Sequence, residues 1–179
     1  VSGGLALLSE GETGRTGDRF TLRIEPDLMF YTFGKGPEAS GFAALVQSLG
    51  FPGLLLSPDD ETLERGADAG CAIRHLTSRT FPDDLAVDDR CAITLFFHDH
   101  DWEPPVLAAA LRTPAVYIGA QGSQRARDMR LAELEAMGVP EAARARLVGP
   151  VGLIPSARDP QTLAVSVLAE ILAKVNGLQ

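Results

Sequence analysis

The feature that most constrains this chain is a repeated pattern, in which a short apolar run ends in a turn and a helix-like segment follows. Apolar runs predict five strands, at residues 28–33, 53–56, 71–76, 92–97 and 115–118. Apolar strands that alternate with helices are typical of a parallel sheet covered on both faces. Because crossovers between parallel strands are right-handed, the sequence predicts an α/β fold with a doubly wound, Rossmann-like sheet of order 3-2-1-4-5.

The intervening segments carry helix signals. Helices are predicted at residues 38–49, 60–65, 104–112, 123–137, 140–146 and 160 to about 175. The last has Asp159 as a candidate N-cap and Pro160 at its first helical position. With 179 residues, of which 45% are hydrophobic, the chain has the size and composition of one domain with a sizeable core.

The N-terminal part has a different composition. Residues 1–18 are rich in Gly, Ser, Thr and Glu, so we expect a flexible arm there and a Rossmann-like domain over residues 19–179. Phe20, Leu22 and Ile24 alternate with polar residues. This period of two predicts a half-buried strand added at an edge of the sheet.

Charge and composition exclude several classes of partner. The chain has 16 basic and 24 acidic residues, a net charge of −8, which argues against nucleic acid and anionic membranes. It has no apolar run of membrane-spanning length and no visible leader, so we expect a cytoplasmic protein. Cys71 and Cys91 are too few for a disulfide framework, and each is either a core residue or a reactive thiol.

A glycine turn follows the first predicted strand. Gly34-Lys35-Gly36 matches the start of the G-x-G-x-x-G dinucleotide fingerprint, and Ser57, with Asp59 just beyond, takes the place of its ribose-binding acid. Glu38 would lie close to a pyrophosphate and repel it, which Lys35 would offset in part. The turn is therefore a candidate phosphate site, with tight packing of the glycines as the alternative.

A second glycine turn follows the fifth predicted strand, in the run Gly119-Ala120-Gln121-Gly122-Ser123. Ser123 resembles an N-cap whose neighbouring N–H groups could bind a phosphate. Arg125 falls in the first helical turn, where a cation is unfavourable for the helix dipole, and this points to a ligand or a carboxylate partner. Arg127 and Arg130 are expected on a solvated helix face.

Two of the three histidines follow the fourth strand, in His98-Asp99-His100-Asp101. In an extended segment His98 and His100 point the same way. They could line a ligand site, transfer protons, cap the local structure or bind a metal ion. A metal would need a third ligand such as Asp59 or Asp101, so we predict ligand contact and no metal site.

Four segments together resemble the Rossmann-like C-terminal domain of the XdhC/CoxI family, the xanthine dehydrogenase accessory factors. They are residues 97–101, 117–125, 149–153 and 164–171, and the resemblance extends over roughly residues 28–175. It implies that the chain binds the molybdenum cofactor, as molybdopterin or its dinucleotide form, and delivers it to a molybdenum hydroxylase client. A cysteine desulfurase and a second copy of the chain are further candidate partners. The candidate cofactor-binding residues are Gly34, Lys35, Gly36, Ser57, Asp59, His98, Asp99, His100, Gly119, Gln121, Gly122, Ser123 and Arg125.

The chain departs from this family at the first turn. The family usually has Gly-Ala-Gly-His-Val where residues 34–38 stand, and an acidic pair in place of Ser57-Pro58. These differences argue against a nucleotide at the first turn and leave the second turn intact. We recognise no counterpart of the family's N-terminal domain, and expect a shortened member or a fragment. The expectation is a cofactor-binding accessory protein; the alternatives are an NAD(P)-dependent oxidoreductase and a degenerate domain that binds only a protein partner.

Overall fold

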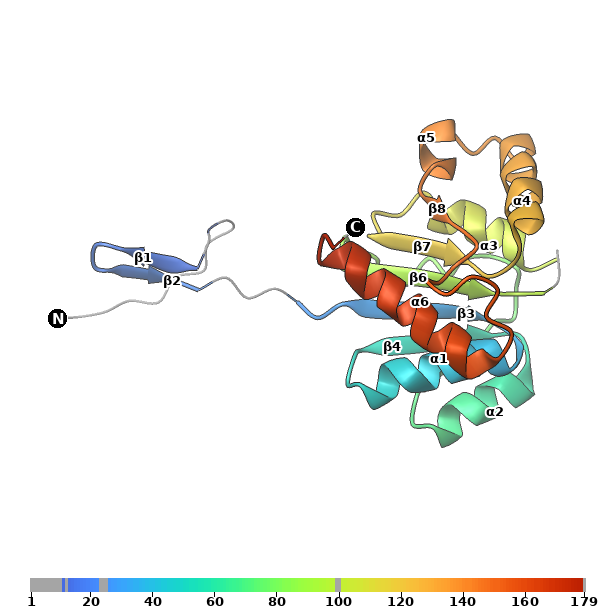
Figure 1. Cartoon of the computed structure of the whole chain (residues 1–179), viewed down its shortest axis with the longest axis horizontal. Coiled ribbons are helices and arrows are strands. Elements are labelled where there is room, and N and C mark those ends of the chain that lie inside the picture. Colours follow the sequence, from blue (N-terminus) through green and yellow to red (C-terminus); the bar gives the residue numbers. More distant parts are fainter. Residues whose placement is uncertain (1–10, 12, 23–25, 99–100, 179) are drawn as a thin grey trace.

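The computed structural model describes residues 11, 13–22, 26–98 and 101–178. These residues form a six-stranded parallel sheet with the order β5-β4-β3-β6-β7-β8 (Figure 1). Its strands are β3 (Met29–Gly34), β4 (Gly53–Ser57), β5 (Ala72–His75), β6 (Cys91–Phe96), β7 (Tyr117–Ala120) and β8 (Leu147–Val148). The predicted fold class and the order of the five predicted strands are confirmed. The sequence pattern missed β8, because two residues are too short a run to reveal a period.

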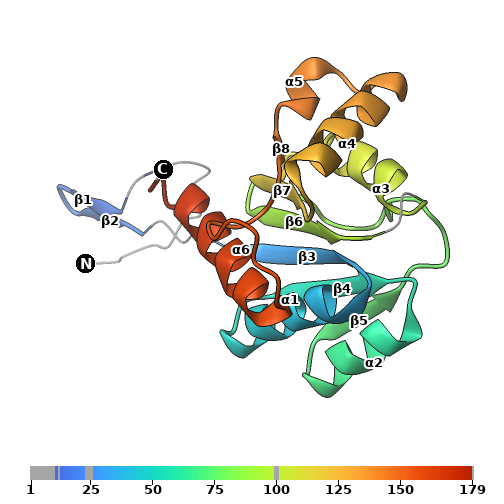
Figure 2. The same ribbon diagram turned by 45° about the vertical axis from the view of Figure 1, so that its right-hand side comes forward.

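Helices cover both faces of the sheet. They are α1 (Gly36–Ser48), α2 (Asp60–Asp68), α3 (Glu103–Ala110), α4 (Gln124–Ala136), α5 (Glu141–Arg144) and α6 (Pro160–Val175). In Figure 2, α6 lies beside α1 on one side of the sheet, and α3 and α4 lie on the other. All six predicted helices are present, with ends shifted by a few residues.

Two hydrophobic cores follow from this arrangement, one on each face. Phe30 of β3 packs into the core beneath α1, α2 and α6, while Tyr31 and Phe33 pack into the core beneath α3 and α4. β6 is buried along its whole length. The central strands are therefore apolar on both faces, which explains why they read as continuous apolar runs.

The N-terminal strand does not join the large sheet. β1 (Gly14–Thr16) and β2 (Arg19–Thr21) pair with each other, antiparallel, in a separate hairpin that stands away from the sheet in Figure 1. The predicted half burial is wrong, because Phe20 and Leu22 are 68% and 61% exposed; Ile24 lies outside the described residues. Gly17, at φ +61°, occupies the two-residue turn, so local hairpin chemistry governs the pairing.

No helix in the described ranges has both the length and the apolar character needed to cross a bilayer.

Candidate functional site

The parallel strands β3, β6 and β7 end at the same edge of the sheet, on the right in Figure 1. The chain order reverses between β3 and β6, and ligands of doubly wound sheets bind at such a point. The first glycine turn (residues 34–38) joins β3 to α1, and the second (residues 119–125) joins β7 to α4. Because β6 lies between them, the ends of β3 and β7, from which the two turns leave, are about 10 Å apart, two strand spacings.

The start of the first turn is packed tightly against β6. A Cβ atom on Gly34 would lie 2.5 Å from the carbonyl oxygen of Phe96, so only glycine fits at this position. The Lys35 amide donates a hydrogen bond to the same oxygen, at 3.1 Å. The glycine and the amide beside it therefore join two strands, which supports the packing interpretation for Gly34.

The next amide of the first turn is also used by the chain. Gly36 N donates to Thr62 Oγ1 at 2.8 Å, and the Thr62 hydroxyl donates to Asp59 Oδ2 at 2.5 Å. Asp59 caps α2 by accepting from the Thr62 amide, and these bonds lower the pKa of Asp59. Ser57 is fully buried and its hydroxyl accepts from the Asp59 amide. The groups predicted to meet a nucleotide thus form a network joining α1, α2 and β4.

Glu38 lies over the first turn where a phosphate would be expected. Its side chain is 19% exposed, and its Oε2 lies 3.7 Å from His98 Nε2 and 3.4 Å from where a Cβ on Gly36 would be. A carboxylate in the first turn of a helix interacts favourably with the helix dipole and repels a second anion. In the first turn the Glu38 carboxylate therefore supplies the negative charge that a bound phosphate would otherwise bring to the N-terminus of α1.

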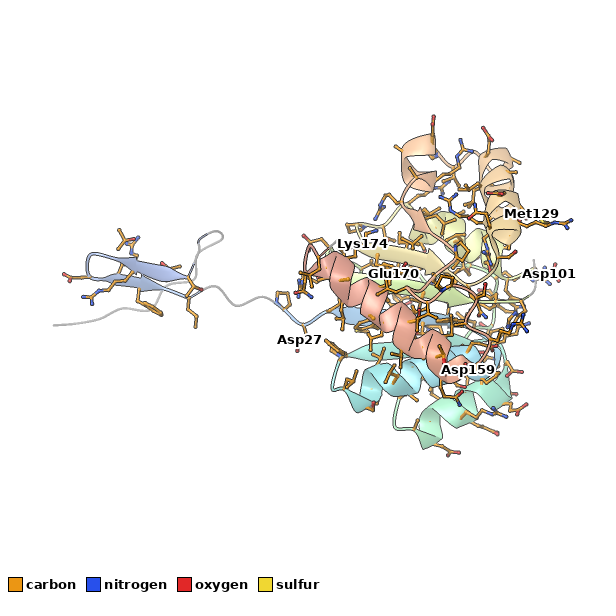
Figure 3. The ribbon with its side chains drawn as sticks, in the orientation of Figure 1. Asp27, Asp101, Met129, Asp159, Glu170 and Lys174 are labelled. Atoms are coloured by element: carbon orange, nitrogen blue, oxygen red, sulfur yellow. The ribbon has the colours of Figure 1, made fainter. Side chains whose placement is uncertain are left out.

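His98 faces this first turn, through its contact with Glu38, and is itself exposed. Asp99 and His100 lie outside the described residues. Asp101, which Figure 3 labels at the edge where the strands end, forms an exposed ion pair with Arg79 at 3.3 Å. The described residues bring no three His, Cys, Asp or Glu side chains together as a metal site.

The second glycine turn is open. Ser123 caps α4 as predicted, because its hydroxyl accepts a hydrogen bond from the Ala126 amide at 3.2 Å. Within the described chain, no group accepts a hydrogen bond from the backbone amides of Gly122, Ser123, Gln124 or Arg125. The Arg125 side chain is exposed and forms no ion pair with a described carboxylate. The turn therefore has four consecutive exposed residues whose amides have no described acceptor, and the last of them carries an exposed guanidinium.

A buried ion pair supports the second turn. The Arg130 guanidinium pairs with Glu103 and donates to the carbonyl oxygen of Gln121. The side chains of Arg130 and Glu103 are only 11% and 7% exposed, so the prediction of a solvated face for Arg130 is wrong. Gly122 must be small, because a Cβ there would lie 3.0 Å from Arg130 Nη1. No local sequence pattern reveals this pair, since Glu103 lies 27 residues away on α3.

The residues beneath the second turn are structural. A Cβ on Gly119 would lie 2.5 Å from the Tyr117 ring, and the Gln121 amide donates to Leu95 O at 2.9 Å. The Gln121 side-chain oxygen is buried with no hydrogen-bond partner among the described residues. Gly119 and Gln121 therefore shape the turn from the sheet side, and residues 122–125 form its outer surface.

A second polar contact fixes the segment that follows β8. Glu170 of α6, which is labelled in Figure 3, accepts hydrogen bonds from the Tyr117 hydroxyl at 2.5 Å and from the Gly152 amide at 3.0 Å. Burial and the Glu170 carboxylate raise the pKa of Tyr117. Ser166 accepts a hydrogen bond from the Ile154 amide at 2.7 Å. The segments at 149–153 and 164–171 thus form one packed unit, in which Glu170 and Ser166 act as anchors.

The two cysteines belong to the core rather than to a reactive site. Cys91 is 2% exposed, and burial raises its pKa to about 11. Burial also raises the pKa of Cys71. At neutral pH both side chains are protonated thiols, and thiols are weak nucleophiles.

A groove of about 400 Å³ opens between α1, α2 and α6, and Ala44, Leu45, Ala164 and Val165 are among the residues that line it. The residues that line this groove come from the three helices and their ends, and none of them belongs to the second turn.

Comparison with known proteins decides the family. Residues 30–171 match the family described as the XdhC Rossmann domain. The chain belongs to this family. The chain is 29% identical over 167 residues to the molybdenum cofactor insertion chaperone PaoD of Escherichia coli K12, an alignment that covers 93% of the chain and 46% of PaoD. It is 33% identical over 121 residues to the uncharacterized protein YqeB of the same organism, covering 68% of the chain and 20% of YqeB.

A solved structure has the same fold. A crystal structure described as a xanthine dehydrogenase from Bacillus halodurans matches with a TM-score of 0.70 and 20% identity, over 86% of this chain and 44% of that one. The chain thus spans less than half the length of PaoD and of the Bacillus protein.

Proposed function

We propose that this XdhC Rossmann domain binds the molybdenum cofactor and takes part in its delivery to a molybdenum hydroxylase. Its family and its similarity to a molybdenum cofactor insertion chaperone support this role. The cofactor is a pterin dithiolene that carries a phosphate, in some forms extended to a dinucleotide. The protein's contribution is to hold that phosphate, and the client enzyme receives the cofactor.

The open second turn carries this proposal. Four backbone amides at the N-terminus of α4 have no acceptor among the described residues, and such amides are a suitable site for a phosphate. The exposed guanidinium of Arg125 adds a charge-assisted donor, the kind that binds phosphate most strongly. Arg130 and Glu103 hold the turn in shape before the ligand arrives, so little ordering is required on binding.

The first turn argues against the NAD(P)-dependent alternative. A dinucleotide in the usual orientation would place its pyrophosphate against the Glu38 carboxylate. It would also meet the Lys35 and Gly36 amides, which already donate to Phe96 and Thr62. A cysteine desulfurase and a second copy of the chain are not required for binding at the second turn.

The test measures the stability of the protein by thermal unfolding in the presence of molybdopterin, its cytosine dinucleotide, NAD or NADP. A ligand at one hundred times its Kd should stabilise the wild-type protein by about 2.7 kcal/mol. Arg125→Ala should bind molybdopterin at least about tenfold more weakly, because one charge-assisted contact is lost. Lys35→Ala is the matched control on the other turn and should bind normally. Equal weakening by both substitutions, or stabilisation by NAD alone, would contradict the proposal.

A delivery assay tests the second half of the proposal. Apo-hydroxylase supplied with cofactor should gain activity faster in the presence of the wild-type domain than in the presence of Arg125→Ala. The same rate with both proteins would show that the second turn has no part in delivery.

A further inference from the structure

The proposed phosphate site leaves one conspicuous group unexplained, the Glu38 carboxylate at the first turn. Its side chain is four-fifths buried, and its Oε2 lies 3.7 Å from His98 Nε2. It comes from the start of α1, and His98 follows β6, so the pair lies at the point where the chain order of the sheet reverses. A carboxylate in this position is an acceptor at the place where ligands of such sheets bind.

The chemistry of Glu38 selects the kind of group that can bind there. An ionised carboxylate only accepts hydrogen bonds, through two oxygens with about four lone-pair sites. Oε2 can therefore face His98 and still accept from a ligand. The best partner is a rigid edge with two adjacent N–H donors, which binds a carboxylate through two parallel hydrogen bonds. Phosphates are repelled, and an adenine or nicotinamide ring lacks such a paired donor edge.

The surroundings of Glu38 suit a flat heterocycle. The Lys35 ammonium lies 6.0 Å from the centre of the Trp102 ring, so the side chain of the first turn reaches an aromatic ring. Aromatic side chains next to hydrogen-bonding groups commonly stack on the faces of flat ligands. The ends of β3 and β7, from which the two turns leave, are about 10 Å apart, two strand spacings, so one ligand can have a ring at the first turn and a phosphate at the second.

We propose that Glu38, positioned by His98, accepts hydrogen bonds from the 2-amino-4-oxo-pyrimidine edge of the ligand whose phosphate binds the second turn. This edge presents a ring N–H and an exocyclic amine side by side, and it occurs in pterins and in guanine. The inference rests on the proposed function, because it assumes that the phosphate is held by residues 122–125. The first turn then binds the ring of the ligand, and Glu38, which repels phosphate, serves as the acceptor for that ring.

The experiment compares ligands that differ at this edge and share a phosphate. Guanosine and inosine monophosphates differ only in the exocyclic amine, and neopterin monophosphate offers the same edge on a pterin. Isothermal titration calorimetry should give the wild-type protein at least about tenfold higher affinity for the guanosine than for the inosine compound. Glu38→Gln should remove this preference, because the glutamine amide has an NH₂ group where the carboxylate has its second oxygen. This NH₂ group is a donor and cannot accept a hydrogen bond from the ligand's amine. Glu64→Gln, at an exposed position on α2, is the matched control and should keep it.

The outcomes separate this inference from the function on which it rests. Tighter binding of neopterin monophosphate than of guanosine monophosphate identifies a pterin as the source of the edge, and the reverse order identifies a guanine nucleotide. Equal affinity for the guanosine and inosine compounds in the wild-type protein, or a preference that survives in Glu38→Gln, overturns the role of Glu38. If Arg125→Ala still weakens both compounds equally, the phosphate site stands. If the wild-type protein binds none of the three at millimolar concentration, both proposals fail.

Discussion

The two glycine turns of this domain look alike in sequence and differ in what their backbone amides do. In the first turn the Lys35 and Gly36 amides donate to Phe96 and Thr62, and residue 37 is a proline, which has no N–H. In the second turn the amides of residues 122–125 have no acceptor among the described residues. The amides of the first turn are used by the chain itself, whereas those of the second turn are available to a ligand.

Charge strengthens this difference. Glu38 supplies a carboxylate at the N-terminus of α1, whereas the first turn of α4 has no acidic residue and contains Arg125. Both helix dipoles favour a negative charge at this end. One helix receives that charge from its own sequence, and the other can receive it from a bound anion. A glycine-rich strand-to-helix turn is therefore an anion site only when neighbouring elements leave its amides free.

The largest expected effect comes from removing the support of the second turn. Arg130→Met removes the guanidinium that pairs with the buried Glu103 carboxylate, and we expect a loss of about 3–5 kcal/mol in the free energy of unfolding. Urea denaturation measures this, and Arg125→Met is the control, expected to stay within about 0.5 kcal/mol of the wild type. Recovery of stability in Arg130→Met with Glu103→Leu would confirm the pair, and equal stability of the two single Arg variants would contradict it.

Gly34 and Gly122 each precede the N-cap residue of their helix, and alanine at these two positions should differ in its effect on stability. Gly34→Ala places a Cβ 2.5 Å from the Phe96 carbonyl oxygen, and we expect a loss of about 2–3 kcal/mol. Gly122→Ala meets the Arg130 guanidinium at 3.0 Å, a contact that a small shift relieves, and must adopt φ +146°, so it should lose about 1 kcal/mol. Thermal unfolding ranks the two variants. If Gly122→Ala were the less stable of the two, the first turn would not be the more tightly packed one.

The hydrogen-bond network of the first turn should respond to pH. Thr62→Val removes the acceptor of the Gly36 amide and the donor to Asp59, for a loss of about 1–2 kcal/mol at neutral pH. Folding lowers the pKa of Asp59, so its contribution is complete above the unfolded pKa of about 4 and is lost as the pH falls through the lower folded value.

The stability gap between wild type and Thr62→Val should therefore narrow as the pH is lowered from 6 to 3. Unfolding in urea at each pH measures it. Thr80→Val, at an exposed position, is the control and should show no such trend. A gap that stays constant over this range would show that Asp59 does not depend on Thr62.

The smallest change in stability tests the comparison most directly. Ser123→Asp keeps a capping side chain on α4 and should alter stability by less than about 0.5 kcal/mol. It gives the second turn its own carboxylate, as Glu38 gives the first. Binding of molybdopterin should then fall by at least about tenfold through repulsion, whereas Ser123→Asn should bind nearly normally. Undiminished binding by Ser123→Asp would place the phosphate elsewhere.

Much of the fold could be predicted from local patterns. Buried strands, helix periods and the caps Asp159 and Ser123 depend on residues close in sequence, and each was recognised there. The hairpin partner of β2 was missed because the residues of β1 have no apolar alternation. The candidate site was only partly predictable. Thr62 has no motif of its own, and Glu103 meets Arg130 across 27 residues.

The sequence by itself determined a doubly wound α/β domain with two glycine turns at one edge of its sheet, because apolar periodicity and turn residues act over short distances. Only the tertiary structure decided which turn keeps its amides available. That depends on acceptors brought from elsewhere in the chain, Phe96 of β6 and Thr62 of α2, which meet the first turn and have no counterpart at the second among the residues that the structure describes. Hydrogen bonds between distant segments exist only once the strands are aligned, and no local pattern encodes them.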